Sequence, residues 1–334
     1  MGRRNARVLV TGASGFVGTA LINRLANESG VHLRAGSRHL LPSTPGAETI
    51  LVPDLGSGAS WSAALQGIDV VIHLAARVHV MRDRATDPLA EFQRVNTTGT
   101  AVLARQAAQA GARRFVFLSS VKVNGEETSK GCPYTENDAP APVDAYGVSK
   151  YEAEVALRKV AAETGLEVVI IRPPLVYGPG VKANFRRLVQ LVSRGVPLPF
   201  GAIHNLRSFV ALDNLVDLIS VGVSHPAAAN QTFLVSDGED MSTTELLRRV
   251  GRALGSKARL IPVPAAILRA TLTALNRRDI ALRLCGSLQV DISRAREMLD
   301  WRPPLTVDEA LRRVTIDFLA SDPGASLNRT AALE

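Results

Sequence analysis

The sequence of 334 residues has few cysteines, few aromatic residues and no long apolar run, and each shortage excludes a class of protein. Cys132 and Cys285 lie far apart and form no CxxC pair, so we expect two reduced thiols, without a disulfide framework, a zinc site or any other metal centre. Aromatic residues make up 4% of the chain, too few for the stacking platforms of a protein that binds single-stranded nucleic acid.

The most apolar late stretch runs from Leu260 to Leu275 and contains two prolines and Arg269. It is too short and too interrupted to span a bilayer, so we expect no stable membrane insertion. A helix lying on a membrane surface is one alternative for this stretch, and a helix packed on its own domain is the one we favour. The basic N-terminus is not followed by the apolar region of a signal peptide, which predicts a cytoplasmic protein.

Positive charge is in excess, with a net charge of +8, but it is spread along the chain. The 39 Lys and Arg residues alternate with 31 Asp and Glu residues, and no dense basic run occurs beyond Met1–Arg4. We therefore expect no nucleic-acid partner, and we attribute the excess to solvated surface and to attraction for a phosphorylated small molecule.

A strand, a glycine turn and a helix follow one another near the N-terminus. The β-branched run Arg7–Thr11 ends at a glycine-rich segment, and Thr19–Ala26 has the apolar spacing of a helix. This order predicts a dinucleotide site, because Gly12, Gly15 and Gly18 let the backbone approach a pyrophosphate and the helix N-terminus offers free N–H groups. The spacing is GxxGxxG, whereas GxGxxG is the commoner fingerprint.

The end of the second predicted strand, Val31–Gly36, is where dinucleotide folds usually carry an acidic residue for the ribose 2′-OH. This chain has Ser37 and Arg38 there. Because no carboxylate at that point would repel a 2′-phosphate, we expect NADP(H) to be favoured, with NAD(H) as the alternative.

Further apolar segments predict parallel strands covered on both faces, namely Thr49–Asp54, Val70–Ala76, Phe115–Ser120 and Val168–Arg172. Asp54 is placed to meet the adenine amino group, and the small residues Ala75 and Ala76 leave room for a cofactor. A helix is expected from about Asn96 to Ala110. The alternation of strands and helices predicts an α/β fold with a doubly wound parallel sheet of the Rossmann type.

Tyr146 and Lys150 lie four residues apart at the predicted start of a helix, so they share one helix face. A cation beside a tyrosine favours the phenolate and brings its pKa toward neutrality. An isolated YxxxK is usually a surface feature, but here Ser119 and Ser120 stand at the end of a central strand, where open α/β sheets place ligands.

From about residue 176 the alternation loosens, and we place a smaller C-terminal α/β substrate-binding domain mainly here. We expect residues 1–175 to form mainly the NAD(P)-binding domain, residues 176–320 mainly the substrate-binding region with some segments returning to the first domain, and residues 321–334 a frayed tail.

Within this second part, residues 176–180 are predicted to form a turn, and Asn184 to open a helix over residues 185–194. Asn184 and Arg207 are candidate donors to a diphosphate. The alternatives are helix capping for Asn184 and surface solvation for Arg207.

Five ordered motifs and two late ones resemble the extended short-chain dehydrogenase/reductase family, in its nucleotide-sugar epimerase/dehydratase branch. They are TGASGFVG at 11–18, HLAA at 73–76, SSVKVNG at 119–125, YGVSK at 146–150, RPPLVYGPG at 172–180, and the late LRSFV and LDW. The resemblance covers about residues 6–318. It implies a Rossmann domain, a smaller C-terminal domain, a UDP-sugar in the cleft between them, and a homodimer.

The resemblance also implies a role for each matching residue. Tyr146 exchanges the proton of the sugar hydroxyl, Lys150 binds the nicotinamide ribose and lowers the tyrosine pKa, and Ser120 orients the substrate oxygen. The expected cofactor contacts are Gly12, Gly15, Phe16, Val17, Gly18, Ser37, Arg38, Asp54, Leu55, Leu74, Ala75, Ala76, Tyr146, Lys150 and Pro173. The expected substrate contacts are Ser120, Lys122, Asn184 and Arg207.

Departures from the family pattern guide the choice of reaction. Val121 and Lys122 stand where dehydratases of this branch carry acidic residues, so dehydration is disfavoured. Leu175 replaces an asparagine of many members, which favours a deoxy sugar.

We therefore favour an NADPH-dependent C4 reductase of a UDP-4-keto-6-deoxy-hexosamine, as in surface polysaccharide or O-antigen synthesis. The alternative is a UDP-sugar 4-epimerase for UDP-glucose or UDP-GlcNAc, with retained NAD and the same catalytic residues. A third hypothesis is a non-catalytic protein that senses NADP, which the presence of both Tyr146 and Lys150 opposes.

Overall fold

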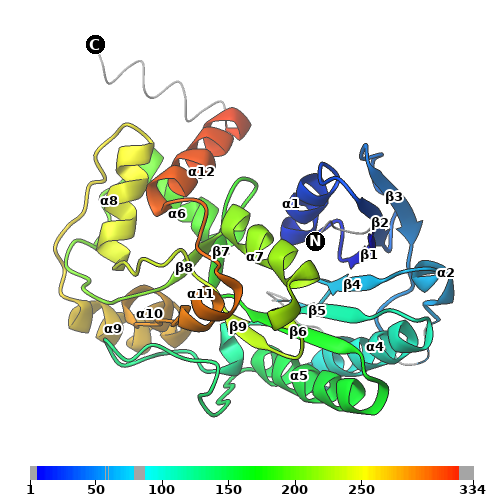
Figure 1. The fold of residues 1–334 in the computed structure, drawn as a ribbon. Helices are drawn as coiled ribbons and strands as arrows, with labels where there is room; N and C mark the ends of the chain where they lie inside the picture. Colours follow the sequence, from blue (N-terminus) through cyan, green and yellow to red (C-terminus); the bar gives the residue numbers. More distant parts are fainter. Residues whose placement is uncertain (1–5, 57, 59, 79–86, 323–334) are drawn as a thin grey trace.

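Seven parallel strands form the central sheet of the computed structural model, which describes residues 6–56, 58, 60–78 and 87–322 (Figure 1). In chain order the strands are β1 (Ala6–Thr11), β2 (Val31–Ser37), β3 (Ala47–Leu51), β4 (Val70–His73), β5 (Arg114–Leu118), β6 (Glu167–Arg172) and β9 (Thr232–Leu234). Their order in the sheet is β3-β2-β1-β4-β5-β6-β9, so the direction of winding reverses between β1 and β4. This is the doubly wound arrangement, and the predicted Rossmann fold is confirmed.

Helices cover both faces of the sheet (Figure 1). One face carries α1 (Phe16–Leu25) and α7 (Leu212–Ser224), and the other carries α2 (Ser62–Leu65), α4 (Gly99–Gln109) and α5 (Ala145–Thr164). Successive side chains of a strand point to opposite faces, so Val8 and Val10 of β1 join the first layer while Leu9 joins the second. Because both layers exclude water, the central strands are mainly apolar, whereas the edge strand β3 has no buried residue.

Shorter segments complete the first part of the chain. They are α3 (Pro88–Phe92), a π-helical turn η1 (Gln93–Thr98) that leads into α4, and a 3₁₀ turn η2 (Val121–Val123) after β5. The predicted helix over Asn96–Ala110 is thus built from η1 and α4.

Three predicted strands end earlier than expected. The third stops at Leu51, because Pro53 has no N–H to continue the ladder, and this leaves Asp54 in the following loop. The fourth stops at His73 and the fifth at Leu118, so Ala75 and Ser120 lie just beyond the sheet. The carboxyl ends of these strands therefore open toward the same edge of the sheet.

A third apolar core lies in the C-terminal half, around a two-stranded parallel sheet of β7 (Leu175–Tyr177) and β8 (Phe209–Ala211). The predicted turn at 176–180 is therefore wrong in its first half, because the partner strand β8 lies 34 residues further along the chain and local sequence does not reveal it. The helices here are α6 (Ala183–Ser193), α8 (Thr243–Ala253), α9 (Ala265–Ala274), α10 (Arg278–Cys285), α11 (Ser293–Leu299) and α12 (Val307–Ser321), with a 3₁₀ turn η3 (Pro226–Ala228).

The second half of the chain also contributes to the first, since β9 completes the main sheet beside β6. The predicted tail lies outside the described residues from position 323 onward. A helix able to cross a bilayer is absent from the described part of the chain.

His73 is completely buried in β4, and its ring nitrogens lie 2.6 Å from Thr11 Oγ1 and 3.0 Å from Thr100 Oγ1. Burial, assisted by the charge of Lys150, lowers the pKa of His73 to about 3. Between that value and about 6.5 the unfolded chain binds the proton and the folded chain does not. Folding stability should therefore fall as the pH falls through this range.

We predict that a His73→Gln variant loses less unfolding free energy than the wild type when the pH is lowered from about 7 to about 4.5. Urea unfolding followed by circular dichroism at both pH values measures the two differences. Identical pH dependence in both proteins would assign the acid sensitivity to other groups.

Candidate active site

The turn between β1 and α1 brings two backbone segments very close together. Gly12 has a φ of +72°, and a Cβ atom on it would lie 2.7 Å from the backbone nitrogen of Ala75. A Cβ atom on Gly18 would lie 2.1 Å from the carbonyl oxygen of Gly12. Only glycine fits at both positions, and the backbone is left bare beside the N-terminus of α1, where an anion is stabilised.

A cleft of about 560 Å³ lies against this turn, which is a usual size for a small-molecule site. Most of the cofactor contacts predicted from the sequence line it, namely Gly12, Gly15, Phe16, Val17, Gly18, Ser37, Arg38, Asp54, Leu55, Leu74, Ala75 and Ala76. Sequence reasoning missed Trp61 and Val95, which also line the cleft but belong to no recognisable motif. The glycines leave the backbone of the turn without side chains, and no side chain caps the start of α1. Together with the size of the cleft, these features fit a dinucleotide.

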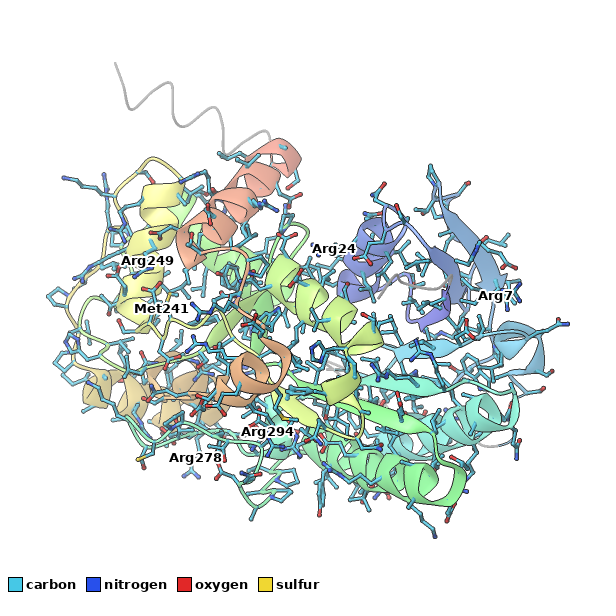
Figure 2. The ribbon with its side chains drawn as sticks, viewed as in Figure 1. Arg7, Arg24, Met241, Arg249, Arg278 and Arg294 are labelled. Carbon is cyan, nitrogen blue, oxygen red and sulfur yellow. The ribbon has the colours of Figure 1, made fainter. Side chains whose placement is uncertain are left out.

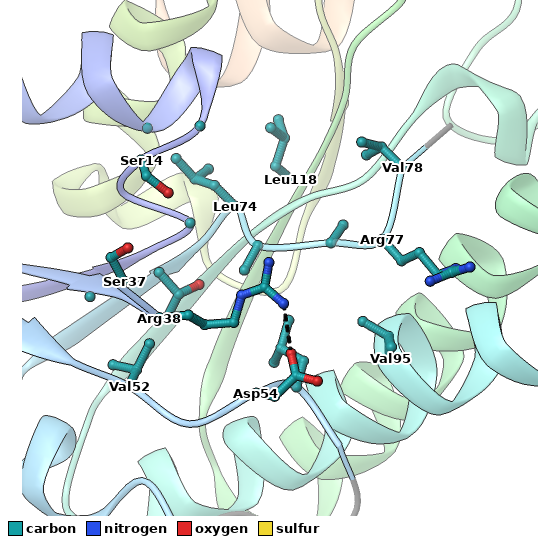
Figure 3. A pocket seen from close by; sticks show the side chains of 18 of the residues that line it. Ser14, Ser37, Arg38, Val52, Asp54, Leu74, Arg77, Val78, Val95 and Leu118 are labelled. Carbon is teal, nitrogen blue, oxygen red and sulfur yellow. Dashed lines mark hydrogen bonds and ion pairs between the residues drawn. The ribbon is translucent and has the colours of Figure 1, made fainter. Parts of the chain in front are cut away.

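Arg38 and Asp54 form an ion pair at the rim of this cleft, with Arg38 Nη1 3.0 Å from Asp54 Oδ1 (Figure 3). Both side chains are more than half exposed, so a ligand can reach them. Ser37 is buried instead, and its hydroxyl accepts a hydrogen bond from the backbone nitrogen of His39. The positive charge expected at the end of β2 is thus present, but a carboxylate already neutralises it.

The first turn of α5 holds Tyr146 and Lys150. Asp144 caps this helix by accepting a hydrogen bond of 2.7 Å from the backbone nitrogen of Gly147. The hydroxyl of Ser120 lies close enough to the phenol of Tyr146 to lower its pKa, and the ammonium of Lys150 lies 4.0 Å from the centre of the Phe117 ring. The structure therefore brings the three predicted catalytic residues to one place, beyond the carboxyl ends of β4 and β5.

Burial dominates the electrostatics of this group. It raises the pKa of Tyr146 to about 12, with a further rise from Asp144 and an opposing effect of the Ser120 hydroxyl. It lowers the pKa of Lys150 to about 7, against the opposing charge of Glu154. In the cofactor-free protein, burial thus outweighs the expected lowering of the tyrosine pKa by Lys150, because both charged forms lose hydration.

A buried ion pair adjoins the group of Ser120, Tyr146 and Lys150. Arg172, at the end of β6, donates to both carboxylate oxygens of Glu154 in α5, at 2.9 Å and 2.6 Å. The same carboxylate accepts from the Ser119 hydroxyl at 2.6 Å, and Arg172 also donates to Asn124 Oδ1 at 3.0 Å. The two strand-end serines therefore differ: Ser119 belongs to this network, whereas Ser120 faces Tyr146.

Asn96 joins two further parts of the site. It lies in the π-helical turn, exchanges hydrogen bonds with the backbone of Arg77 after β4, and donates to the Ser149 hydroxyl at 3.0 Å. Ser149 in turn donates to the carbonyl of Tyr146. These bonds fix the cleft wall relative to the start of α5. Separately, the carbonyl of Pro173, after β6, accepts a hydrogen bond of 3.0 Å from the backbone nitrogen of Val121, after β5.

The three other predicted substrate contacts are placed differently. Lys122 is ion-paired with Asp144 and, at 3.2 Å, with Glu126. Asn184 is exposed and is the second residue of α6, so it does not cap that helix, whose N-cap is Lys182. Arg207 is mostly covered and donates to the carbonyls of Leu282 and Gly286 around the end of α10.

A second cavity, of about 680 Å³, shares Ser14, Gly15 and Phe16 with the first and continues to Gly180 and Lys182. It leads from the glycine turn toward α6, which carries Asn184. Lys182 was not predicted, because an isolated loop lysine carries no motif. Within the ranges that the structure describes, no cluster of His, Cys, Asp or Glu is arranged to hold a metal ion.

A model of the NAD dependent epimerase/dehydratase family matches residues 8–236, which include the glycine turn, Ser120, Tyr146 and Lys150. The chain belongs to this family. The predicted family is confirmed, and so is the prediction of an enzyme of the short-chain dehydrogenase/reductase type acting on nucleotide sugars.

Relatives within the family match the chain along most of its length. A UDP-glucose 4-epimerase of Vibrio cholerae is 46% identical over 94% of this chain and 96% of its own. The N-acetyl-alpha-D-glucosaminyl-diphospho-ditrans,octacis-undecaprenol 4-epimerase of Escherichia coli O157:H7 is 30% identical over 79% and 78%, respectively. Among solved structures, MoeE5 in complex with UDP-glucuronic acid and NAD is similar with a TM-score of 0.75, at 27% identity over 95% of this chain and 100% of that one.

We predict that Glu154→Gln lowers the unfolding free energy by about 3–5 kcal/mol, because it leaves the buried guanidinium of Arg172 without its counter-ion. Urea denaturation at neutral pH measures the loss. Glu163→Gln is the matched control, since Glu163 is in the same helix but its partner Arg105 is exposed, and it should cost about 0–1 kcal/mol. Equal losses in the two variants would contradict a structural role for the buried pair.

Proposed function

We propose that this enzyme is a UDP-sugar 4-epimerase. The observation that carries the proposal is the grouping of Ser120, Tyr146 and Lys150 just beyond the end of β5, whose last residue, Leu118, lines the glycine-lined cleft. The 46% identity to the Vibrio cholerae UDP-glucose 4-epimerase over nearly the whole chain supports the same reaction. Inversion at C4 needs one group to take and return a proton at O4, and Tyr146 is suited to this task.

In this proposal each residue of the group has a defined task. Ser120 donates a hydrogen bond to O4 and fixes its position, while Tyr146 in its phenolate form removes the O4 proton and later restores it. Lys150 in its charged form stabilises that phenolate. The glycine turn and the cleft would hold NAD, which when bound would supply the chemistry of accepting a hydride from C4 and giving it back. The sugar passes through a 4-keto form and rotates between the two transfers, so that the hydride returns to the opposite face of C4.

The Arg38–Asp54 pair bears on the choice of dinucleotide. With Asp54 in place, the guanidinium is neutralised and a 2′-phosphate would meet the carboxylate, which supports NAD. With Arg38 released, the same site suits the 2′-phosphate of NADP. The pair supports NAD retention by an epimerase more directly than it supports exchange of NADPH.

The second candidate is the NADPH-dependent C4 reductase of a UDP-4-keto-6-deoxy-hexosamine. Two observations favour it: Arg38 stands at the cleft rim, and Leu175 is 43% exposed where many members carry an asparagine. Such a reductase would use Tyr146 to protonate the carbonyl oxygen, so the catalytic group is the same for both reactions.

Incubation of the purified enzyme with UDP-glucose or UDP-GlcNAc and NAD, without a reductant, is expected to interconvert the C4 epimers with no net change in NADH absorbance. Product analysis by NMR or anion-exchange chromatography measures the conversion. Consumption of NADPH in proportion to a UDP-4-keto-6-deoxy sugar, with no epimerisation, would instead establish the reductase.

Tyr146→Phe is expected to lower turnover by about 10²–10⁴-fold, the usual contribution of a positioned acid or base. Tyr151→Phe removes a phenol from the same helix outside the catalytic group, and it should retain wild-type turnover. Full activity of Tyr146→Phe would refute the proposed role.

We predict that the Arg38–Asp54 pair sets the dinucleotide preference. Arg38→Ser should lower the affinity for NADP relative to NAD by about tenfold or more, because a charge-assisted hydrogen bond is lost, and Asp54→Asn should raise it. Dissociation constants from fluorescence or calorimetry give both ratios. Arg105→Ser serves as the control, and unchanged ratios in the two test variants would rule out contact with the 2′-phosphate.

A further inference from the structure

The helices α9 and α10 form a hairpin at an outer edge of the molecule, far from the main sheet (Figure 1). No residue of α9 is buried, although seven of its ten residues are Ala, Ile or Leu. Around it Ile261, Ile267 and Leu275 are 50%, 56% and 64% exposed. The helix favoured from the sequence as packed on its own domain thus leaves a large part of its apolar surface in water.

Positive charge gathers on the same hairpin and on the segment that leads into it. Residues 257–283 contain six Lys or Arg residues and one Asp, a net charge of +5 against +8 for the whole chain. The cations are exposed, and Arg278 is visible at this edge of the molecule in Figure 2; the set is Lys257, Arg259, Arg269, Arg277, Arg278 and Arg283. The sequence showed no dense basic run because these residues are spaced. The packing of α9 against α10 places four of them, Arg269, Arg277, Arg278 and Arg283, on one hairpin, while Lys257 and Arg259 lie in the segment that leads into it.

We propose that the α9–α10 hairpin docks the enzyme on the surface of a membrane that contains anionic phospholipid. Exposed aliphatic side chains with surrounding Lys and Arg are the composition of helices that lie in the lipid headgroup region. In this arrangement the cations face the lipid phosphates, and the exposed aliphatic side chains enter the boundary of the acyl chains.

Other occupants suit the hairpin less well. A nucleic acid would match the charge but not the apolar surface, and residues 257–283 contain no aromatic side chain to stack on bases. A second copy of the chain would bring the same net charge of +5 against itself if it paired through this face.

The docking face is connected to the candidate substrate region. Arg207, a predicted diphosphate contact, donates to the carbonyls of Leu282 and Gly286 at the end of α10. Glu127 lies 3.8 Å from Arg269 of α9 and also acts on the charge of Arg207. Docking would therefore hold the C-terminal part of the site beside the membrane surface. The proposal stands independently of the epimerase reaction.

Sedimentation with lipid vesicles tests the proposal on the full chain. The protein should bind vesicles of phosphatidylcholine mixed with phosphatidylglycerol, bind much less to phosphatidylcholine alone, and be released by sodium chloride as the charges are screened. Arg277→Gln and Arg278→Gln should weaken partitioning by about fivefold for each charge removed.

The apolar part of the surface is tested by a triple variant, Ile261→Ser, Ile267→Ser and Leu275→Ser, which should lose most vesicle binding at moderate salt. Val155→Ser with Ile316→Ser is the matched control, because these residues are 49% and 62% exposed on α5 and α12. The control should bind as the wild type does. Thermal unfolding of every variant shows that the fold is kept.

Three results would overturn the proposal. They are absence of binding to anionic vesicles by the wild type, equal binding by the wild type and the triple variant, and binding that does not depend on the phosphatidylglycerol content of the vesicles. Sedimentation velocity adds a fourth: if the triple variant turns a dimer into a monomer and vesicles do not bind, the hairpin is an interface between copies of the chain.

Discussion

The buried pair of Glu154 and Arg172 is the interaction on which the arrangement of the site depends. It joins α5 to the end of β6, and through Ser119 and Asn124 it also holds the end of β5 and the turn that follows. Because both charges are removed from water, neither can be lost without leaving the other uncompensated. The hydroxyl of Ser120 and the first turn of α5 are thereby kept at a fixed separation.

A second electrostatic arrangement surrounds Tyr146. Asp144 caps α5 and so helps to place the tyrosine, but its negative charge also raises the tyrosine pKa. Lys122 pairs with Asp144 and reduces that cost. The phenol of the free protein is therefore held protonated, while burial leaves Lys150 easily deprotonated. A charged ligand entering beside this group would change both equilibria, because little water is present to screen it.

Local patterns predicted the parts of the site that depend on backbone chemistry. The glycine turn was predictable because a strand, closely spaced glycines and a helix follow one another along the chain. The structure adds the reason for the glycines, since a Cβ atom on Gly12 or Gly18 would collide with the neighbouring backbone. The serine pair was predictable because a strand end in a parallel sheet faces the ligand edge. Asn184 was predicted to open α6, but that helix begins at Ala183, since helix boundaries depend on the packing of the loop before them.

By itself, the sequence determined the order of strands and helices up to β6, the glycine turn and the pairing of Tyr146 with Lys150 on one helix face, because each depends on residues close along the chain. Only the tertiary structure decided what surrounds them. It placed Asp54 against Arg38, 16 residues away, and Glu154 against Arg172, and it brought the spaced cations Arg269, Arg277, Arg278 and Arg283 onto one hairpin. Charge partners are set by distance in space, and that distance is known only once the chain is folded.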